Sequence, residues 1–324
     1  MNILGIETSC DETAAAVVRN GQYILSNIVT SSLTEHKKYG GIIPEIASRR
    51  QMEWITPIVR EALSKARVSL NQIEAVAVTQ KPGLIGSLLV GISFAQALSF
   101  ALDKPTIAID HIHAHIYANF LTVAKDSKQS TPRPKLPAVG VVVSGGHSSL
   151  FYIPSFHRFK LIGQTRDDAA GEAFDKVARI LGLGYPGGPI IDRLAQQGAN
   201  REIHFSCAQL PQTLDFSFSG IKTAVLYYKR NHAHNSSSTV AKIAYTFQES
   251  VVSVIVQKSI EACLQYCTKT LLVGGGVAAN SRLRQCLKEV SAKHKINVYY
   301  PPLNLCLDNA AMIAGLGYQL LLKK

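Results

Sequence analysis

The chain has 324 residues, and its 47% hydrophobic and 17% charged content excludes an intrinsically disordered protein. At about 150 residues per domain, this length predicts two domains. Lys and Arg number 34 against 22 Asp and Glu, and the resulting net charge of +12 favours a polyanionic partner, either nucleic acid or an acidic membrane. The alternative is a general solubility charge with no specific partner.

Six scattered cysteines form no C-x-x-C pair, and a chain of this length needs no covalent staples, so we expect reduced thiols in a cytoplasmic protein. The N-terminal residues lack the basic and apolar regions of a signal peptide.

In chain order, apolar runs and turn residues predict strands at 2–7, 13–19 and 22–30, a helix at 44–66, a strand at 73–79 and a helix at 84–102. The polar stretch 124–134 predicts a surface loop. Further strands are expected at 137–143, 148–153 and 270–273, the last followed by glycines and a helix.

The apolar stretch 84–102 is nearly long enough to span a membrane. It also carries a stripe of small residues at every fourth position, Ser87, Gly91, Ala95 and Ser99, which would let another backbone approach closely. We therefore expect a buried helix and no membrane association.

The order strand, polar turn, strand, strand, helix occurs in both halves of the chain and suggests a divergent duplication. Two such α/β lobes would enclose a central cleft. Ligands of open α/β sheets bind at the carboxyl ends of the strands, so we expect the turns there to carry the site.

A histidine pair is the first candidate site. His111 and His115 are four residues apart, so on a helix they share one face and can hold a metal ion, whereas His113 points elsewhere. In a zinc protease of the H-E-x-x-H type, a glutamate would follow the first histidine, but here Ile112 stands there.

Two glycine-rich turns are the second candidate site. The turns at 143–147 and 274–280 follow strands and would let backbone N–H groups approach a phosphate or carboxylate, although each also suits an ordinary turn. Asp175 could bind a ligand hydroxyl, Asn280 could cap a helix or bind a sugar or base, and Asp308 could be a helix cap, a third metal ligand, or both.

Over nearly its whole length the chain resembles the TsaD family of tRNA adenosine threonylcarbamoyltransferases. The motifs that carry the resemblance are GIETSCDET at 5–13, YGGIIPE at 39–45 with ASR at 47–49, PGLIGSL at 82–88, the histidine pair, VSGGH at 143–147, DDAAGEAFDK at 167–176, FSFSGIKTAV at 216–225, GGVAANSRLR at 275–284 and LDNAAMIA at 307–314.

The resemblance implies a duplicated fold of the actin, Hsp70 and sugar-kinase type. We expect residues 1–106 with a C-terminal helix at 308–324 to form the first lobe, and residues 107–307 to form the second. The implied reaction transfers the threonylcarbamoyl group of threonylcarbamoyl-AMP to the exocyclic amine of the adenosine beside the anticodon, in tRNAs that read codons beginning with A, and releases AMP.

The resemblance also implies the ligand sets. The implied metal is Fe²⁺, or else Zn²⁺, and its ligands match His111, His115 and Asp308, a set that suits ferrous iron on ligand grounds as well. Asp11 or Glu12 could accept the proton of the amine. The donor-binding positions match Val143, Ser144, Gly145, Gly146, His147, Asp175, Gly188, Asp192 and Asn280.

The implied partners are tRNA, threonylcarbamoyl-AMP, a TsaB-like paralogue that docks on the first lobe and a small TsaE-like ATPase. We expect tRNA to bind a basic surface formed by Lys37, Lys38, Arg49, Arg50, Lys81, Arg282 and Arg284.

The sequence departs from the family pattern at Gln51, Lys81, Asp110 and Leu307, none of which is a proposed ligand. The alternatives are a small-molecule kinase, which has no use for the histidine pair, a metalloprotease, which lacks its base, and a scaffold, which would lack the metal ligands.

Overall fold

The computed structural model describes residues 1–123, 133–198, 203–232 and 236–322. Contacts divide the chain into a first unit, Met1–Pro134 with Pro301–Lys324, and a second unit, Lys135–Tyr300. These boundaries differ from those expected at 106 and 307, because the elements that follow residue 106 pack with strands and helices of the first unit. The predicted loop at 124–134 lies, up to residue 132, outside the described residues.

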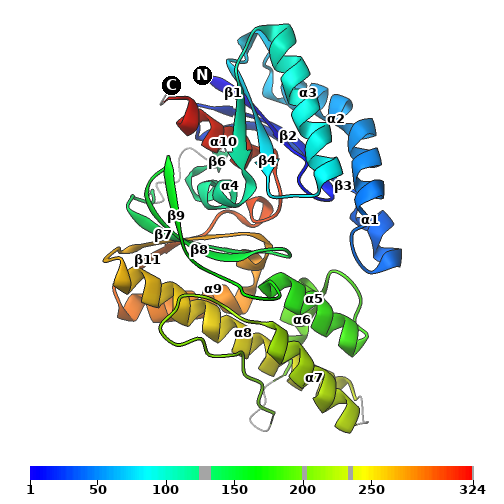
Figure 1. Cartoon of the computed structure of the whole chain (residues 1–324), viewed down its shortest axis with the longest axis vertical. Coiled ribbons are helices and arrows are strands. Elements are labelled where there is room, and N and C mark those ends of the chain that lie inside the picture. The colour runs from blue at the N-terminus through cyan, green and yellow to red at the C-terminus, as the bar shows by residue number, and fades with distance from the viewer. Residues whose placement is uncertain (124–132, 199–202, 233–235, 323–324) are drawn as a thin grey trace. The chain divides into compact units, whose positions relative to one another are not determined.

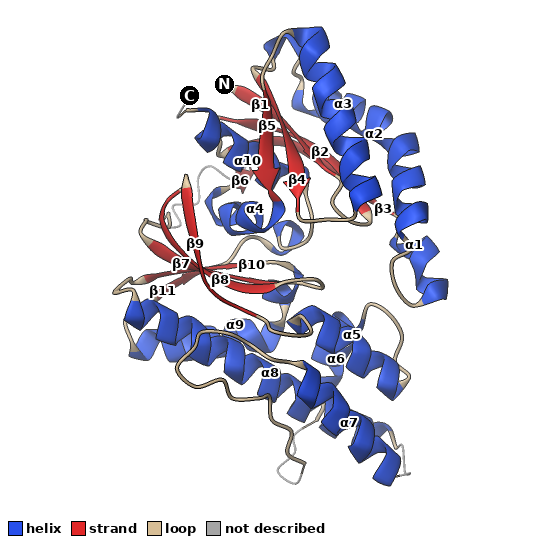
Figure 2. Ribbon diagram, in the orientation of Figure 1, coloured by secondary structure: helices blue, strands red, loops and turns tan. Residues whose placement is uncertain are grey.

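The first unit is built on a mixed sheet with the strand order β5-β4-β1-β2-β3-β6 (Figures 1 and 2). The strands are β1 (Asn2–Glu7), β2 (Glu12–Arg19), β3 (Tyr23–Ser31), β4 (Ala75–Lys81), β5 (Thr106–Asp110) and β6 (Thr122–Val123). β1 to β3 form an antiparallel meander, whereas β4 pairs parallel to β1, and β5 parallel to β4.

The second unit repeats this pattern. Its strands are β7 (Ala138–Val143), β8 (Ser148–Ser155), β9 (Arg158–Gln164), β10 (Thr270–Gly274) and β11 (Asn297–Tyr299). Their order is β11-β10-β7-β8-β9, with β7 to β9 antiparallel and β10 and β11 added in parallel, as in the first unit. The first sheet has the additional strand β6, but the order and orientation of the other five strands are the same in both sheets and confirm the predicted duplication.

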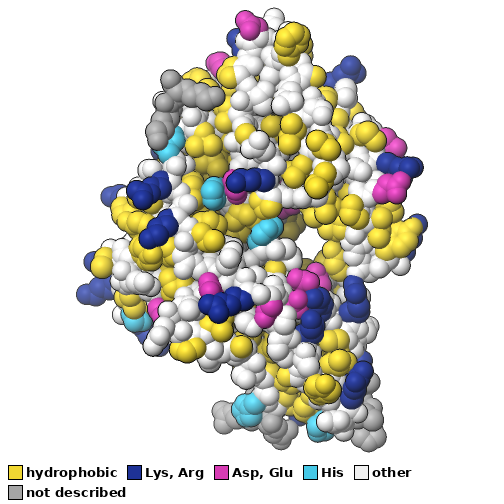
Figure 3. Space-filling model, in the orientation of Figure 1, with side chains coloured by type: hydrophobic (Ala, Val, Ile, Leu, Met, Phe, Trp, Pro, Cys, Tyr) yellow, Lys and Arg dark blue, Asp and Glu magenta, His cyan; other side chains and the backbone are white. Residues whose placement is uncertain are grey.

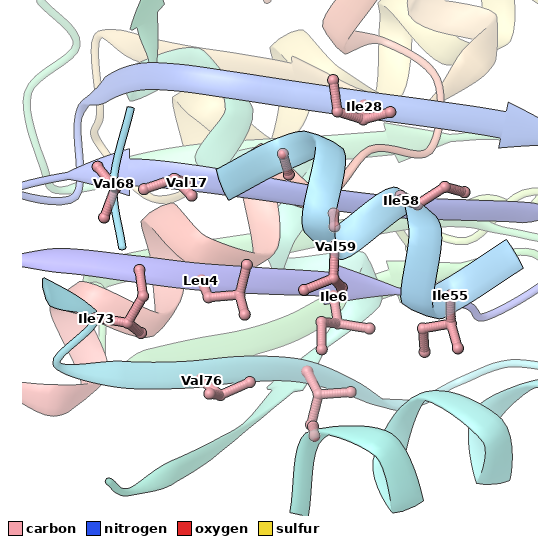
Figure 4. Packing of buried hydrophobic residues seen from close by; sticks show 14 residues of the cluster. Leu4, Ile6, Val17, Ile28, Ile55, Ile58, Val59, Val68, Ile73 and Val76 are labelled. Carbon is pink, nitrogen blue, oxygen red and sulfur yellow. The ribbon is translucent and has the colours of Figure 1, made fainter. Parts of the chain in front are cut away.

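Helices cover both faces of the first sheet: α2 (Pro44–Ala66) and α3 (Ile85–Leu102) on one face, and α4 (His111–Tyr117) and α10 (Ala310–Leu321) on the other, with the short α1 (Leu33–His36) beside them. Figure 4 shows how Leu4 and Ile6 of β1 meet Ile55 and Val59 of α2 in the core. In the second unit the helices are α5 (Ala170–Leu181), α6 (Gly187–Ala195), α7 (Ser219–Asn231), α8 (Ser237–Gln265) and α9 (Ser281–Lys293).

Helix α3 is long and apolar enough to cross a membrane by length and composition alone. Its small-residue stripe is buried, as predicted, and the helix packs against α2 and β4. The opposite side is open, however, since Ile85 is 78% exposed and Phe100 91% exposed. The prediction of a buried helix therefore holds for only one face.

The alternate residues of β1 point to α10 on the other face, and at Gly5 the two elements almost touch. A Cβ atom at this position would lie 2.7 Å from the backbone nitrogen of Ala314 and still closer to the carbonyl oxygen of Ala310. Only glycine allows this approach, because the obstructing atoms are backbone atoms that cannot move independently of the helix.

We predict that Gly5→Ala destabilises the first unit by at least about 1–3 kcal/mol, because α10 must move away from β1. Thermal unfolding of the purified variant checks this. The matched control is Gly41→Ala, where an added Cβ would meet no atom within 4 Å and the melting temperature should not change. Equal melting temperatures for both variants would contradict the close approach.

Candidate metal centre and nucleotide-binding loops

The two histidines lie on α4, which begins directly after β5. The side chain of Asp110 caps this helix, since Oδ1 accepts hydrogen bonds from the backbone nitrogens of Ile112 at 3.0 Å and His113 at 3.2 Å. Because His111 and His115 are four residues apart on this helix, their Nε2 atoms lie 3.1 Å from each other. Both rings are buried, so no bulk water separates these nitrogens.

Asp308 comes from the other end of the chain and completes the group. Its Oδ1 lies 3.1 Å from Nε2 of His115 and 3.5 Å from Nε2 of His111. It is not the cap of α10: Asn309 takes that role by accepting from the backbone nitrogen of Met312, which leaves the Asp308 carboxylate free to turn toward the histidines.

These three side chains fit a metal ion. One ligand atom from each lies within 4.8 Å of the other two. Two imidazole nitrogens and a carboxylate oxygen aimed at one point suit Fe²⁺ or Zn²⁺. Burial lowers the pKa of His111, but the negative charges of Glu7 and Asp308 outweigh burial, so the pKa of His111 is raised. Burial raises the pKa of Asp308, but His111 and His115 outweigh burial, so the pKa of Asp308 is lowered. The site is therefore electrostatically suited to positive charge.

Sequence reasoning missed Glu7, which holds His111 in place. The fully buried Glu7 Oε2 lies 2.8 Å from Nδ1 of His111 and accepts from the Thr79 hydroxyl at 2.6 Å, while Oε1 accepts from the Ser9 backbone nitrogen at 2.5 Å. The carboxylate requires the proton of the imidazole to sit on Nδ1, which leaves the Nε2 lone pair for a metal. The sequence could have indicated this role, because Glu7 is a charged residue at the end of a strand that is otherwise apolar.

The two proposed proton acceptors occupy the turn after β1. Gln51 steadies this turn by donating to the carbonyl oxygens of Cys10 at 2.9 Å and Glu12 at 3.1 Å. Asp11 accepts from the Ser31 hydroxyl at 3.2 Å. Burial, followed by repulsion from Asp308 and Asp11, raises the pKa of Glu12 to about 10, so Glu12 is protonated at neutral pH and cannot act as a base in the absence of a bound cation.

In the second unit, the turn after β7 closes on itself. The Ser144 backbone nitrogen donates to the His147 carbonyl at 2.8 Å, and the His147 backbone nitrogen donates to the Ser144 hydroxyl at 3.1 Å. A Cβ at Gly145 or Gly146 would meet no atom within 4 Å, so both glycines face open space. Val143 is completely buried and could contribute only its backbone to a ligand.

The first turn of α5 packs on this loop. A Cβ at Gly171 would lie 2.8 Å from the backbone nitrogen of Gly145, and the Gly171 nitrogen donates to the Ser144 carbonyl at 3.0 Å. The partial positive charge of the helix N-terminus therefore lies beside the exposed glycines, an arrangement that favours an anion.

The remaining predicted donor-binding residues cap helices. Asp175 accepts from the backbone nitrogens of Gly187, at 2.7 Å, and Gly188 at the start of α6, and burial raises its pKa despite these bonds. Asp192 accepts from both the backbone nitrogen and the hydroxyl of Ser281 at the start of α9.

Asn280 is the N-cap of α9, with its Oδ1 accepting from the Leu283 nitrogen at 2.9 Å. Its Nδ2 donates to Gln248 of α8, a partner that sequence reasoning missed. Of these three capping residues only Asn280 follows a strand, β10, whereas Asp175 lies on α5 and Asp192 on α6. Each capping role is compatible with a further hydrogen bond to a ligand.

The metal group thus belongs entirely to the first unit, and the glycine turns with their capping residues belong entirely to the second. The histidine pair follows the carboxyl end of β5, and the two glycine turns follow those of β7 and β10, whereas Asp308 directly precedes α10.

The fold places the chain among proteins with the duplicated actin-like architecture. It is similar to HypF from T. kodakarensis, with a TM-score of 0.65 and 14% identity over 99% of this chain and 48% of that one. It is also similar to an activator of the 2-hydroxyisocaproyl-CoA dehydratase from Clostridium difficile, with a TM-score of 0.55 and 14% identity over 100% of this chain and 96% of that one. At this identity the likeness shows the fold alone.

Sequence comparison identifies the family. The profile of TsaD, described as tRNA N6-adenosine threonylcarbamoyltransferase, matches residues 23–315. Proteins of that name from Symbiobacterium thermophilum and Caldicellulosiruptor saccharolyticus are 51% and 48% identical, over 98% and 100% of this chain and 91% and 94% of their own lengths. The chain belongs to the TsaD family, which confirms the resemblance carried by the sequence motifs.

We predict that Glu7→Gln weakens metal binding by about 10–100-fold, because an amide NH₂ facing Nδ1 of His111 favours the tautomer with its proton on Nε2. Calorimetric titration with Zn²⁺, used as an air-stable probe, measures the affinity. His115→Ala, which removes a ligand, should abolish binding, and His113→Ala on the same helix should leave it unchanged. An affinity equal to wild type for Glu7→Gln would show that Glu7 does not orient the ligand.

Proposed function

We propose that this protein transfers the threonylcarbamoyl group of threonylcarbamoyl-AMP to N6 of the adenosine beside the anticodon in tRNAs that read codons beginning with A. The observation that carries the proposal is the buried group of His111, His115 and Asp308 in a chain about half identical to named threonylcarbamoyltransferases over nearly their full lengths.

In this reaction N6 of the adenosine forms a bond to the carbamoyl carbon, and the bond from that carbon to the phosphate oxygen breaks. AMP leaves with the electron pair, and N6 loses a proton. The mixed anhydride is already reactive, so the protein mainly has to position the reactants and stabilise charge.

The second unit would hold the AMP part of the donor. Backbone N–H groups of the Ser144–His147 turn, together with the N-terminus of α5, would bind the phosphate, because the exposed glycines there leave room for close approach. Asp175, Asp192, Gly188 and Asn280, which surround the starts of α6 and α9, would bind the ribose and the base.

The first unit would hold the threonyl end of the donor and receive the proton. His111, His115 and Asp308 would hold Fe²⁺, or else Zn²⁺, and when bound the ion supplies a Lewis acid for the donor's oxygen atoms. Asp11 or Glu12 would accept the N6 proton, with Gln51 fixing the turn that presents both residues.

Partners follow from the same proposal. The open side of α3, with Ile85, Leu89 and Phe100 at helical spacing, offers an apolar surface for a TsaB-like paralogue on the first unit. We further propose a small TsaE-like ATPase as a partner and the cytoplasm as the location, since tRNA is there.

We expect that depletion of this protein removes threonylcarbamoyladenosine from tRNA and that expression of the wild-type chain restores it. Mass spectrometry of the nucleosides provides the measurement. His115→Ala should fail to restore the nucleoside, whereas the control His113→Ala should succeed. Unchanged threonylcarbamoyladenosine after depletion, or ATP-dependent phosphorylation of a small molecule by the purified protein, would refute the proposed reaction.

A second prediction separates ligand binding from helix capping at Asn280. Serine is also a good N-cap, so Asn280→Ser should keep α9 intact while removing the amide. If that amide contacts the donor, affinity for a non-hydrolysable threonylcarbamoyl-AMP analogue should fall about 5- to 150-fold, equivalent to one lost hydrogen bond of roughly 1–3 kcal/mol. Calorimetry gives the affinity, and wild-type affinity with an unchanged melting temperature would make Asn280 a cap alone.

A further inference from the structure

The cations expected to bind tRNA are largely engaged within the protein. Arg49 pairs with Glu45 at 2.7 Å, and Arg50 pairs with both Glu35 and Glu53. In the second unit, both Arg282 and Arg284 are held in place: Arg282 binds Glu249 through two hydrogen bonds, and Arg284 donates to a backbone carbonyl and lies over the ring of Tyr300. These contacts offset the charge of four members of the predicted surface, which stays a prediction. The chain as a whole carries an excess of positive charge.

That excess is concentrated in the second unit. Residues 135–300 contain 19 of the 34 Lys and Arg residues but only 10 of the 22 Asp and Glu residues, so they carry +9 of the net charge of +12. Half the chain thus holds three quarters of the charge that a polyanion would feel.

Much of it gathers at one end of the second sheet. We call this surface the basic end and define it by six exposed cations that form no ion pair with any carboxylate in the described part of the chain: Lys135, Arg158, Lys160, Lys269, Lys293 and Lys295. Figure 3 shows several dark blue side chains over the left end of this sheet, where Figure 1 labels β7, β9 and β11.

Strand topology brings these residues together. β7, β10 and β11 are parallel, so the segments that lead into them meet at one edge of the sheet. There the Lys269 carbonyl accepts from the Asn297 nitrogen at 2.8 Å, and Thr268 donates to the Pro137 carbonyl at 2.7 Å. The β8–β9 hairpin turns at the same end, because Ile153 near the end of β8 pairs with Ala138 at the start of β7.

Partly exposed aromatic rings accompany the charges. Tyr152 and Tyr266 stack with their ring centres 4.7 Å apart, and Nζ of Lys160 lies 5.6 Å from the centre of the Tyr266 ring. Unpaired cations beside aromatic rings are characteristic of surfaces that bind nucleic acid through its backbone and its bases.

We propose that the basic end binds the phosphate backbone of the tRNA substrate. The inference rests on the proposed function, and it adds a contact surface separate from the transfer site. β7 spans about 20 Å at roughly 3.3 Å per residue, so the basic end lies about that far from the glycine turn at the other end of the strand. It therefore contacts nucleotides away from the reacting adenosine and contributes to recognition of the whole tRNA.

The test is a charge reversal at the basic end, Lys269→Glu with Lys293→Glu and Lys295→Glu, measured as tRNA affinity across a series of salt concentrations. We expect affinity to fall at least tenfold at low salt, and the slope of log affinity against log salt to decrease by about 2–3, about one per lost phosphate contact. Zn²⁺ affinity and donor-analogue affinity should stay at wild-type values, which shows that the fold is intact.

The matched control reverses three exposed cations of the first unit, Arg19→Glu with Arg60→Glu and Lys65→Glu, for the same change in net charge. An equal loss of tRNA affinity in the control would show that only the net charge of the protein matters, and would contradict the proposed role of the basic end. So would an unchanged salt slope in the basic-end variant, or a loss of binding to phosphatidylserine vesicles with tRNA affinity intact. If the wild-type protein itself fails to modify tRNA, it is the proposed function that falls.

Discussion

The candidate metal centre depends on how closely α10 packs against β1. The ligands come from positions nearly 200 residues apart, and no local pattern joins them. A side chain at Gly5 would push α10 outward, and Asp308, which directly precedes that helix, would move away from the histidines. Asn309 contributes by capping the helix in place of Asp308. The site is thus a consequence of backbone packing in the centre of the first unit.

Duplication explains why this fold can hold two unlike ligand groups. Apart from β6, both sheets have the same strand order, so each offers polar turns at the carboxyl ends of its parallel strands. The first copy places carboxylates and imidazoles there, which suit a cation. The second places glycines and helix N-termini there, which suit an anion.

The two units also differ in the charge that their side chains carry. Carboxylates gather around the candidate metal centre: burial and then the charges of Asp308, Asp11 and Glu7 raise the pKa of Glu12. The second unit carries most of the positive charge, and part of it stays unpaired at the basic end. A cation would relieve the first imbalance, and an RNA backbone would relieve the second.

Much of this protein could be predicted from the sequence. Alternation and apolar runs placed most strands within two residues, and the spacing of His111 and His115 predicted a shared helix face because helical periodicity is a local property. The motifs that identify the family are local as well, and the family assignment was confirmed.

Tertiary structure decided the rest, since these features depend on which distant segments pack together. The sequence alone left Asp308 open as a cap or a ligand, and only the packing of α10 turned its carboxylate toward the histidines. The role of Glu7 depends on β5 delivering α4 beside β1. The ion pairs of Arg50 with Glu35 and of Arg282 with Glu249 each join two different helices. A sequence lists charges, but whether a charge is paired or available to a ligand is determined by distances of a few ångströms between residues that only the fold brings together.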